Sequence, residues 1–186
     1  MVDPGERQRF ETSVLPHLDA AYNLARWLTH SSDEAVDVVQ EATLRAWRFF
    51  GGFRGGDAKP WFLRIVRNAV LSAYERQGGA NVVPFSSLER EDGSSPLDDI
   101  AAPGGDPEGA LLQLEDRAVV DRLLGRLPAT FREVLVLREL EELSYREIAE
   151  VVQAPIGTVM SRLARARQLL LGYGAELMRE EQGRAL

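Results

Sequence analysis

The stretch LSYREIAEVVQAPIGTVMSRLARAR, residues 143–167, decides the fold class of this chain. Ser144 and Glu147 have the spacing of a capping box, in which the serine and the glutamate each bond the other's backbone N–H. The flanking residues Leu143 and Ile148 suit a hydrophobic staple across the same helix start. A short helix is therefore predicted to begin directly after Ser144.

The predicted helix ends after two turns because Pro155 follows it. Proline disfavours helical geometry at the preceding residue, Ala154, and its fixed φ suits the start of a new helix. The sequence therefore predicts a helix over 145–152, a tight turn, and a second helix from 156. This is a helix-turn-helix, whose second helix is shaped to enter the major groove of DNA.

The second helix is predicted to have one apolar face and one DNA-compatible face when projected at 100° per residue. The predicted buried face comprises Val159, Leu163, Ala166 and Leu170. The opposite face comprises Gly157, Thr158, Ser161, Ala164, Arg165 and Gln168, with Met160, Arg162 and Arg167 on the flanks. The outward side chains are small or hydrogen-bonding, as close approach to base edges requires.

Among these outward residues, Arg165 is the candidate guanine reader, and Thr158 and Ser161 are candidates for base or phosphate contacts. Arg162 and Arg167 are better placed for phosphates. A basic solvated face on a core helix would be the simpler interpretation of an isolated RxxRxR pattern. The capped first helix, the turn and the absence of acidic residues over 157–167 favour DNA binding instead.

The composition is that of a globular protein: 186 residues, 45% hydrophobic and 27% charged, with a net charge of -7. There is no long apolar run and no signal-like N-terminus, so we expect a cytoplasmic protein without membrane insertion. With zero cysteines, disulfides, thiolate zinc sites and redox switches within this chain are excluded. His17 and His30 have no spacing partner for a metal, and no metal, cofactor or small-molecule ligand is expected.

The charge is unevenly distributed along the chain, and this predicts two domains. Residues 45–76 carry seven basic and two acidic side chains, whereas residues 78–108 carry one arginine and seven acids. The acidic stretch is rich in Gly, Pro, Ser and Asp and has no sustained period, which is typical of a linker. The predicted organisation is a domain over 1–77, a flexible acidic linker over 78–108 and a domain over 109–186.

Both domains are predicted to be all-α, because the apolar residues recur at helical spacing and alternating strand patterns are lacking. Ser31 and Glu34 form a second capping-box signature, Gly51 and Gly52 end the helix that it opens, and Gly172 and Gly174 are expected to allow fraying or a bend. The predicted helices cover residues 6–29 with a possible break near Pro16, 33–50, 60–77, 109–126, 129–141, 145–152 and 156–180.

The predicted helix over 60–77 places Trp61, Arg64, Asn68 and Ser72 on one surface. An aromatic ring, cations and an amide are the mixture that single-stranded DNA binding uses. The preceding loop adds a second aromatic and two cations, Phe53, Arg54 and Lys59. An amphipathic helix with its tryptophan in the core is the alternative, and GGFRGG is only a weak match to a phosphate-binding loop.

The predicted helix over 33–50 has a mixed surface that could dock a partner helix. Its hydrophilic residues are Asp33, Asp37, Gln40, Glu41 and Arg45, and its apolar residues are Val36, Val39, Ala42 and Trp47. Charge complementarity around a small apolar centre is how such helices associate. A solvated acidic face is the alternative interpretation.

Three stretches together resemble the sigma-70 family, and specifically its small two-domain extracytoplasmic-function (ECF) group. LRELEELSYREIAEVVQAPIGTVMSRLARARQLL, residues 137–170, resembles region 4. DEAVDVVQEATLRAW, residues 33–47, resembles region 2.2, and FRGGDAKPWFLRIVRNAVLSAYER, residues 53–76, resembles regions 2.3 and 2.4. Many members carry a basic residue in place of Met160 and a larger one in place of Ala164, which leaves the promoter sequence open.

The resemblance implies a promoter-specificity subunit of RNA polymerase that helps to melt DNA for a stress-response regulon. Implied contacts to the upstream (minus-35) element are Arg138, Thr158, Met160, Ser161, Arg162, Ala164, Arg165 and Arg167. Implied contacts to the downstream (minus-10) element are Phe53, Arg54, Lys59, Trp61, Arg64, Arg67 and Asn68, with a flipped base held on the loop. Implied core polymerase contacts are Asp33, Asp37, Gln40, Glu41, Arg45 and Trp47.

The partners that the resemblance implies are core RNA polymerase, through its β′ clamp helices and β flap, promoter DNA and an anti-sigma factor. The acidic linker would thread the active-site cleft and the RNA exit channel, where its charge mimics nucleic acid. Plain disorder of the linker is the alternative, and both can hold at different times.

Other functions fit the residues less well. A stand-alone helix-turn-helix regulator would bind a palindrome as a dimer, but the second basic module is then unexplained and no dimerisation helix is evident. An enzyme is disfavoured because nucleophile motifs, paired catalytic carboxylates and metal clusters are lacking in the sequence. A helical adaptor that never touches DNA is disfavoured by the outward arginines.

Overall fold

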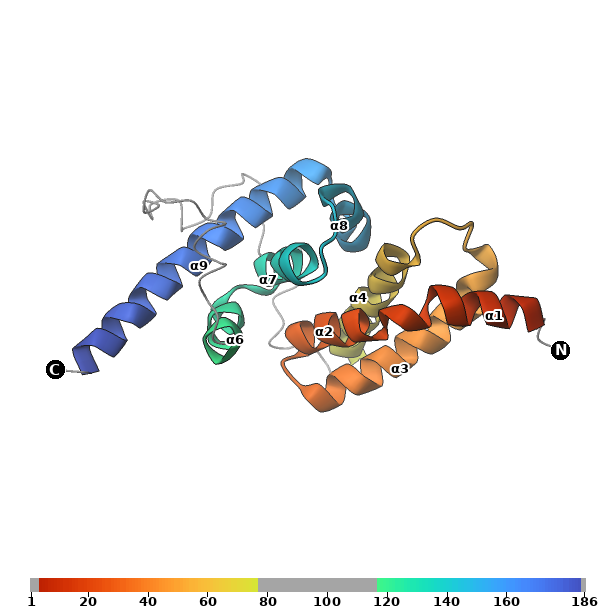
Figure 1. The fold of residues 1–186 in the computed structure, drawn as a ribbon, viewed down its shortest axis with the longest axis horizontal. Helices are drawn as coiled ribbons and strands as arrows, with labels where there is room; N and C mark the ends of the chain where they lie inside the picture. The colour runs from red at the N-terminus through yellow and green to blue at the C-terminus, as the bar shows by residue number, and fades with distance from the viewer. Residues whose placement is uncertain (1–3, 77–116, 185–186) are drawn as a thin grey trace.

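The structure is a computed structural model that describes residues 4–76 and 117–184 (Figure 1). All regular secondary structure in these two ranges is helical. The predicted all-α class is therefore confirmed. The predicted linker over 78–108 and residues 109–116 of the next predicted helix lie outside the described residues.

The first helices form around Pro16, which separates two helical segments as the sequence predicted. Proline removes a backbone donor and suits the start of a helical turn, and it stands inside the first turn of η1. The segments are α1 (Pro4–Ser13), the 3-10 turn η1 (Leu15–His17) and α2 (Leu18–Thr29). α2 ends at His30, which adopts a left-handed φ of 58°.

α3 (Ser32–Phe49) begins at the predicted N-cap, and the side chain of Ser31 accepts a hydrogen bond from the backbone N–H of Glu34. Only this half of the predicted capping box forms. The backbone N–H of Ser31 donates instead to Oγ1 of Thr29, which occupies the donor that the glutamate would need. The 3-10 turn η2 (Phe50–Gly52) ends the helical run at the predicted glycine pair.

The region after the glycine pair leads into α4 (Ala58–Arg76), which packs against α2 and α3. Phe62, Leu63, Val66 and Ala69 are buried along the apolar side of α4. Arg67, which the resemblance implied as a contact to the downstream element, is also buried, with 7% of its surface exposed. Spacing within one helix could not predict this burial, because it does not include the second half of the chain, whose helix α8 packs against α4.

The second half consists of α6 (Arg117–Arg126), α7 (Ala129–Leu135), η3 (Val136–Leu140), α8 (Tyr145–Val152) and α9 (Ile156–Arg184). The predicted helix over 129–141 forms as α7 and η3 in direct succession, and its last turn is a π-helix in which the N–H of Glu141 bonds the carbonyl of Val136. α9 continues through Gly172 and Gly174, where fraying or a bend was expected.

The helix-turn-helix forms as predicted. Ser144 and Glu147 make both bonds of the capping box, at 3.3 Å and 2.7 Å, and start α8. α8 ends at Gln153 in the left-handed conformation, with φ of 56°, and α9 starts directly after Pro155. The turn therefore depends on a non-glycine residue in a conformation that glycine and asparagine adopt more easily.

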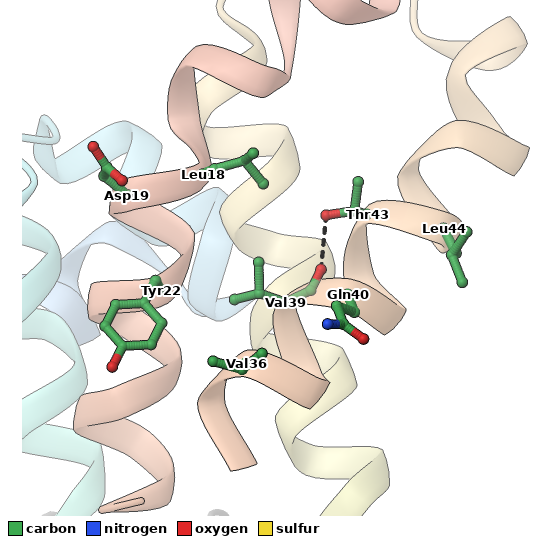
Figure 2. Close-up of a pocket in the computed structure, with 8 residues that line it drawn as sticks. All are labelled: Leu18, Asp19, Tyr22, Val36, Val39, Gln40, Thr43 and Leu44. Atoms are coloured by element: carbon green, nitrogen blue, oxygen red, sulfur yellow. Dashed lines mark hydrogen bonds between the residues drawn. The ribbon is translucent and has the colours of Figure 1, made fainter. Parts of the chain in front are cut away.

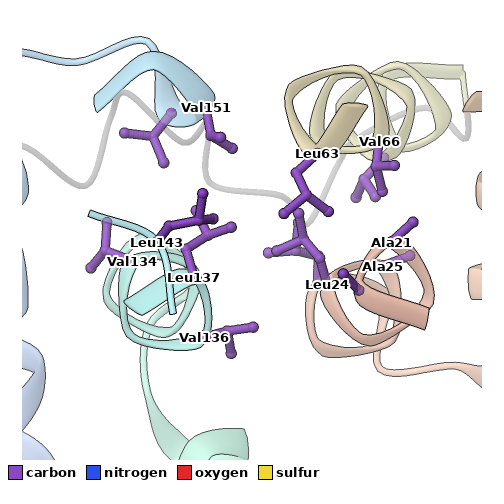
Figure 3. Packing of buried hydrophobic residues seen from close by; sticks show 14 of the residues in the cluster. Ala21, Leu24, Ala25, Leu63, Val66, Val134, Val136, Leu137, Leu143 and Val151 are labelled. Carbon is purple, nitrogen blue, oxygen red and sulfur yellow. The ribbon is translucent and has the colours of Figure 1, made fainter. Parts of the chain in front are cut away.

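The two halves share one hydrophobic core, in which α4 packs against α8 and α2 packs against α7 and η3. Figure 3 shows Leu24 of α2 and Leu63 of α4 pointing into the space between the halves, toward Leu137 and Leu143. All four side chains are at most 3% exposed. The structure is thus a closed arrangement of the two helical units.

Candidate nucleic-acid and polymerase interfaces

The first half of α9 carries the predicted recognition face, and its sides are assigned as predicted. Val159, Leu163 and Ala166 are at most 1% exposed and anchor α9 on α7 and α8. The outward stripe is accessible, and it comprises Gly157, Met160, Ser161, Ala164 and Gln168. This stripe of small and flexible residues can approach a surface closely, as a helix in a major groove must.

The arginines of the recognition region have different environments. Arg165 is partly exposed on the outward side, and its Nη1 donates to Oε1 of Gln168 at 3.3 Å. Arg167 is instead directed to Glu139 of η3, at 2.7 Å. Burial acts to lower the pKa of Arg167, but its hydrogen bonds to Glu139 and Tyr145 prevail and raise it. Both arginines are partly exposed, and Nε and Nη2 of Arg165 are buried, as is Nε of Arg167.

Arg138, another predicted upstream contact, supports the helix-turn-helix from within, whereas the predicted contacts Thr158 and Arg162 are partly exposed on α9. Its Nη1 donates to the carbonyl of Leu143 at 2.9 Å, and its guanidinium lies 5.3 Å from the ring centroid of Tyr145. Both partners flank the N-cap of α8. In this structure Arg138 stabilises the start of the first helix of the motif.

The predicted downstream surface centres on stacked aromatic rings at the loop before α4. The centroids of Phe53 and Trp61 lie 5.0 Å apart, and those of Phe50 and Phe53 lie 5.8 Å apart. Phe53 and Trp61 remain partly exposed, whereas Phe50 is buried beneath them. The rings thus form a supported platform of the kind on which an unpaired base stacks.

The cations and the amide of this surface follow the platform along the chain. Arg54 is exposed, and Arg64 and Asn68 are partly exposed on α4. Gly55 and Gly56 adopt positive φ values of 89° and 96°, which turn the loop after Arg54 and would strain any residue with a side chain. Arg64 and Asn68 follow Trp61 by three and seven residues, a spacing that puts all three along one side of α4.

Two other predicted downstream contacts, Lys59 and Arg67, bond to the second half of the chain; Lys59 is partly exposed and Arg67 is buried. Nζ of Lys59 donates to the carbonyl of Glu141 at 2.7 Å and lies 3.1 Å from its carboxylate. Nε of Arg67 donates to Oε1 of Glu133 in a buried ion pair. The closed arrangement therefore covers part of the predicted downstream surface.

The predicted polymerase-docking helix α3 has an accessible polar stripe, made of Asp33, Asp37 and Gln40. Glu41 is bonded to Arg76 of α4 and to Arg45, and these bonds, chiefly that to Arg76, lower the pKa of Glu41. Trp47 packs edge-on against Phe10, with centroids 5.0 Å apart. Trp47 thus belongs largely to the local core of α1 and α3.

A shallow apolar groove runs beside the polar stripe of α3 (Figure 2). Figure 2 shows side chains of α2 and α3 facing each other across it. Val36 and Leu44 are 44% and 61% exposed there, which is unusual for large apolar residues unless a partner covers them. The residues that line the groove are Leu18, Asp19, Tyr22, Val36, Val39, Gln40, Thr43 and Leu44.

Three residues that join the two halves were not identified from the sequence: Arg132, Glu133 and Glu141. Arg132 donates to backbone carbonyls of α2 and of the α6 terminus, and its Nη1 contacts Nε2 of His30. The sequence does contain one sign of such a contact, the charged pair Arg132-Glu133 inside the otherwise apolar run of α7. Charged residues at positions that a helix buries need partners, and these can come from elsewhere in the chain.

The comparisons with known proteins agree with this arrangement. The family description "Sigma-70 region 2" matches residues 14–79, and "Sigma-70, region 4" matches residues 117–170. The RNA polymerase sigma-H factor of Pseudomonas aeruginosa is 37% identical over 183 residues, which cover 96% of this chain and 93% of that protein. The ECF RNA polymerase sigma-E factor of Escherichia coli is 34% identical over 173 residues, which cover 91% and 88%.

Two solved structures share the fold over nearly the whole chain. The sigma factor RpoE in complex with the anti-sigma factor NepR from Bartonella quintana superposes with a TM-score of 0.65 and 28% identity, covering 88% of this chain and 94% of that one. CnrH in complex with the cytosolic domain of CnrY superposes with a TM-score of 0.61 and 25% identity, covering 91% and 90%.

The chain therefore belongs to the sigma-70 family, with region 2 in its first half and region 4 in its second. Within that family it is a sigma factor of the ECF type. The resemblance seen in the sequence is confirmed, and the stand-alone regulator is not favoured. Among the described residues, no helix is long and apolar enough to cross a membrane, and no cluster of His, Cys, Asp or Glu has the grouping of a metal site.

Proposed function

We propose that this ECF sigma factor reads the upstream promoter element with the outward stripe of α9 and with Arg165, which donates a hydrogen bond to Gln168 of that stripe. Arg165 would discriminate bases, because a guanidinium bonds both acceptor atoms of guanine in the major groove. Thr158, Ser161 and Arg162 would add base or phosphate contacts, and Met160 and Ala164 would contact the groove without a charge. Arg138 and Arg167 would act mainly by fixing the motif through Tyr145, Leu143 and Glu139.

The downstream element would be captured as a single strand on the aromatic platform of Phe53 and Trp61. Stacking on such a ring is worth about 1–3 kcal/mol per base, which offsets the few kcal/mol that extruding a base costs. Arg54 and Arg64 would neutralise phosphates, and Asn68 would contact a base edge or the backbone. Lys59 and Arg67 would join them only after leaving their partners in region 4.

Core polymerase would bind along α3 through Asp33, Asp37, Gln40 and the neighbouring apolar groove. The groove supports this proposal because exposed Val36 and Leu44 supply the apolar centre that a docked helix requires. Glu41, Arg45 and Trp47 would hold this surface in shape through their contacts with Arg76 and Phe10. Region 4 would contact the β flap.

Attachment to the polymerase explains how two small surfaces give a specific complex. A surface with a few arginines typically binds nonspecific DNA with a Kd of about 10⁻⁴ to 10⁻⁶ M at physiological salt. When core polymerase holds both surfaces in place, binding of one surface to DNA makes binding of the other intramolecular, which adds a factor of about 10² to 10⁴ in avidity. Residues 78–108 would span the distance between a domain over 1–77 and one over 109–186, passing through the polymerase cleft.

We further propose that this sigma factor has no catalytic activity of its own and that it directs transcription of a stress-response regulon in the cytoplasm. An anti-sigma factor is the proposed inhibitor. This proposal is supported by the sigma factor RpoE from Bartonella quintana described above, which is bound to the anti-sigma factor NepR.

The observation that carries the proposed function is the pairing of a region 2 match over 14–79 with a region 4 match over 117–170 in one chain. The test is run-off transcription on genomic fragments with purified core RNA polymerase, with and without the full chain. We expect discrete new transcripts only when the chain is added. Tight binding to a duplex site without polymerase, together with no transcripts, would instead support a stand-alone regulator.

A further inference from the structure

The contact between the two halves contains a charged layer of two ion pairs. In both pairs the acid belongs to region 4 and the cation to region 2. Two carboxylates of region 4, Glu133 and Glu141, receive two cations of region 2, Arg67 and Lys59. Nδ2 of Asn23 in α2 also lies 3.3 Å from Oε1 of Glu141. Both cations belong to the downstream DNA surface proposed above, so the acids of region 4 stand where phosphates or base acceptors would otherwise be.

Glu133 is the most costly member of this layer. Its side chain is fully buried, and among the described residues its Oε2 accepts no hydrogen bond. Burial raises the pKa of Glu133, while the neighbouring Arg67 and, more weakly, Arg162 of α9 act to lower it. A buried ion pair loses so much hydration that it contributes little to stability compared with apolar packing. Stability alone therefore does not account for this pair.

We propose that Glu133 and Glu141 form an interdomain latch with Arg67 and Lys59, which holds the free chain closed and withholds these two cations from DNA. The latch rests on the proposed function only in naming what the cations bind after release. In the closed state the carboxylates of region 4 bind these two cations. When the chain opens, Glu133 and Glu141 become hydrated on region 4, and Lys59 and Arg67 become available beside Trp61.

The energetic balance of the latch makes it reversible. Opening rehydrates four charged groups, which compensates for much of the lost attraction between them. Removing one partner alone is different, because the other charge then remains buried without compensation in the closed state. Replacing Glu133 by the isosteric glutamine should therefore shift the open-to-closed ratio by about 100-fold toward the open state.

The first test measures the distance between the halves and involves neither DNA nor polymerase. The chain has no cysteines, so spin labels can be placed with Arg48→Cys on α3 and Glu150→Cys on α8, both at exposed positions. In the otherwise unchanged chain, electron-electron double resonance should give one narrow distance. Glu133→Gln and Glu141→Gln should each give a broad distribution extending to longer distances.

The matched control is Glu176→Gln, which removes the same charge from an exposed pair with Arg126 inside region 4. It should keep the narrow distance. A narrow and unchanged distance in both Glu133→Gln and Glu141→Gln overturns the latch. If Glu133→Gln loses helical circular dichroism, the result for Glu141→Gln decides, because Glu141 lies outside α7 at the end of η3.

The second test asks whether opening releases the cations to nucleic acid. The probe is a labelled mixed-sequence single-stranded DNA, titrated with the full chain at several salt concentrations. Glu133→Gln should bind at least about tenfold more tightly than Glu176→Gln and show a salt slope steeper by about 1.4, which is about 0.7 for each of the two released cations. If Glu133→Gln has opened but binds this DNA with the same affinity and salt slope as Glu176→Gln, the release of the two cations to DNA is refuted.

The two tests separate the latch from the proposed function. If the distance broadens but no variant supports transcription with core polymerase, the latch stands and the proposed function fails. If transcription occurs but both glutamine variants remain closed, the function stands and the latch fails.

Discussion

Arg132 supplies the prediction that is most closely determined by the structure. Its guanidinium donates to the carbonyls of Leu124, Gly125 and Leu127 at the end of α6, at 2.8, 3.2 and 2.6 Å. A further bond of 3.0 Å reaches the carbonyl of Trp27 in α2. The residue is only 5% exposed, and its one side chain satisfies four carbonyl acceptors.

The size of the effect follows from those four acceptors. Gly125 is exposed, so water can replace Arg132 there, and the carbonyl of Leu124 keeps a bond from the backbone N–H of Leu127. Two carbonyls, those of Leu127 and Trp27, would then lose their Arg132 donor. Leaving a buried acceptor unsatisfied costs about 1–3 kcal/mol, which gives about 2–6 kcal/mol for the two. Burial lowers the pKa of Arg132, which means that the cation itself is unfavourably placed, and its removal recovers part of this cost. We therefore expect Arg132→Met to reduce the free energy of unfolding by about 2–4 kcal/mol.

The assay is urea unfolding of the full chain, followed by circular dichroism and by tryptophan fluorescence. All three tryptophans lie in region 2, at positions 27, 47 and 61, so fluorescence follows that half and circular dichroism follows both. The larger loss should appear in the circular dichroism transition, because three of the four bonds lie within region 4. Arg132→Lys should recover less than half of the loss, since an ammonium cannot reach all four carbonyls.

The control is Arg126→Met, which removes an exposed arginine that pairs with Glu176 and lies over Tyr173. This change should cost no more than about 1 kcal/mol, as exposed ion pairs contribute little. The reasoning is refuted if Arg132→Met is no more destabilising than Arg126→Met.

Three further predictions concern promoter recognition and pH. Arg165→Ala should weaken upstream-element recognition by about 1–3 kcal/mol and relax its base preference, as measured by transcription from a set of upstream variants; an equal loss on every variant would make Arg165 a phosphate contact. Asn68→Ala should reduce permanganate-reactive thymines in the promoter while polymerase binding persists, and unchanged reactivity would remove Asn68 from the downstream surface. His30 contacts Arg132 of α7 near Tyr74 of α4 and Glu34 of α3, and burial and Arg132 together lower the pKa of His30. Because the pKa of His30 is lowered, the closed state binds fewer protons than the open state. The contribution of neutral His30 to the stability of the closed state is therefore complete above the ordinary histidine pKa of about 6.5 and is lost as the pH falls below that value. His30→Asn, which tolerates the left-handed backbone at this position, should remove this pH dependence of the interdomain distance; an identical pH dependence in the variant would contradict the assignment to His30.

The features that the sequence predicted correctly are those determined by local chemistry. Ser144 and Glu147 form a capping box because both partners lie within one helical turn. The burial of Val159 and Leu163 follows from their spacing along a single helix. The aromatic platform of Phe53 and Trp61 was also accessible to this reasoning, because its rings are close in the sequence.

The features that were missed depend on partners distant in the sequence. Arg67 and Glu133 are 66 residues apart, and the spacing of residues within a single helix gives no indication that they meet. The continuity of α9 through Gly172 was missed because a glycine costs a helix only about 1 kcal/mol, which packing outweighs. There Leu169, Leu170 and Leu177 are buried on both sides of the glycine. The site residues themselves remain predictions until binding is measured.

The unequal exposure of the two proposed DNA surfaces has a consequence for the order of events at a promoter. The outward stripe of α9 is accessible in the closed chain, whereas Lys59 and Arg67 are held by region 4. With the proposed contacts, the closed chain can bind intact duplex DNA through α9 while part of the surface for single-stranded DNA is still covered. Such a chain would sample duplex sites before it separates the strands, so that brief encounters with genomic DNA would not leave the strands separated.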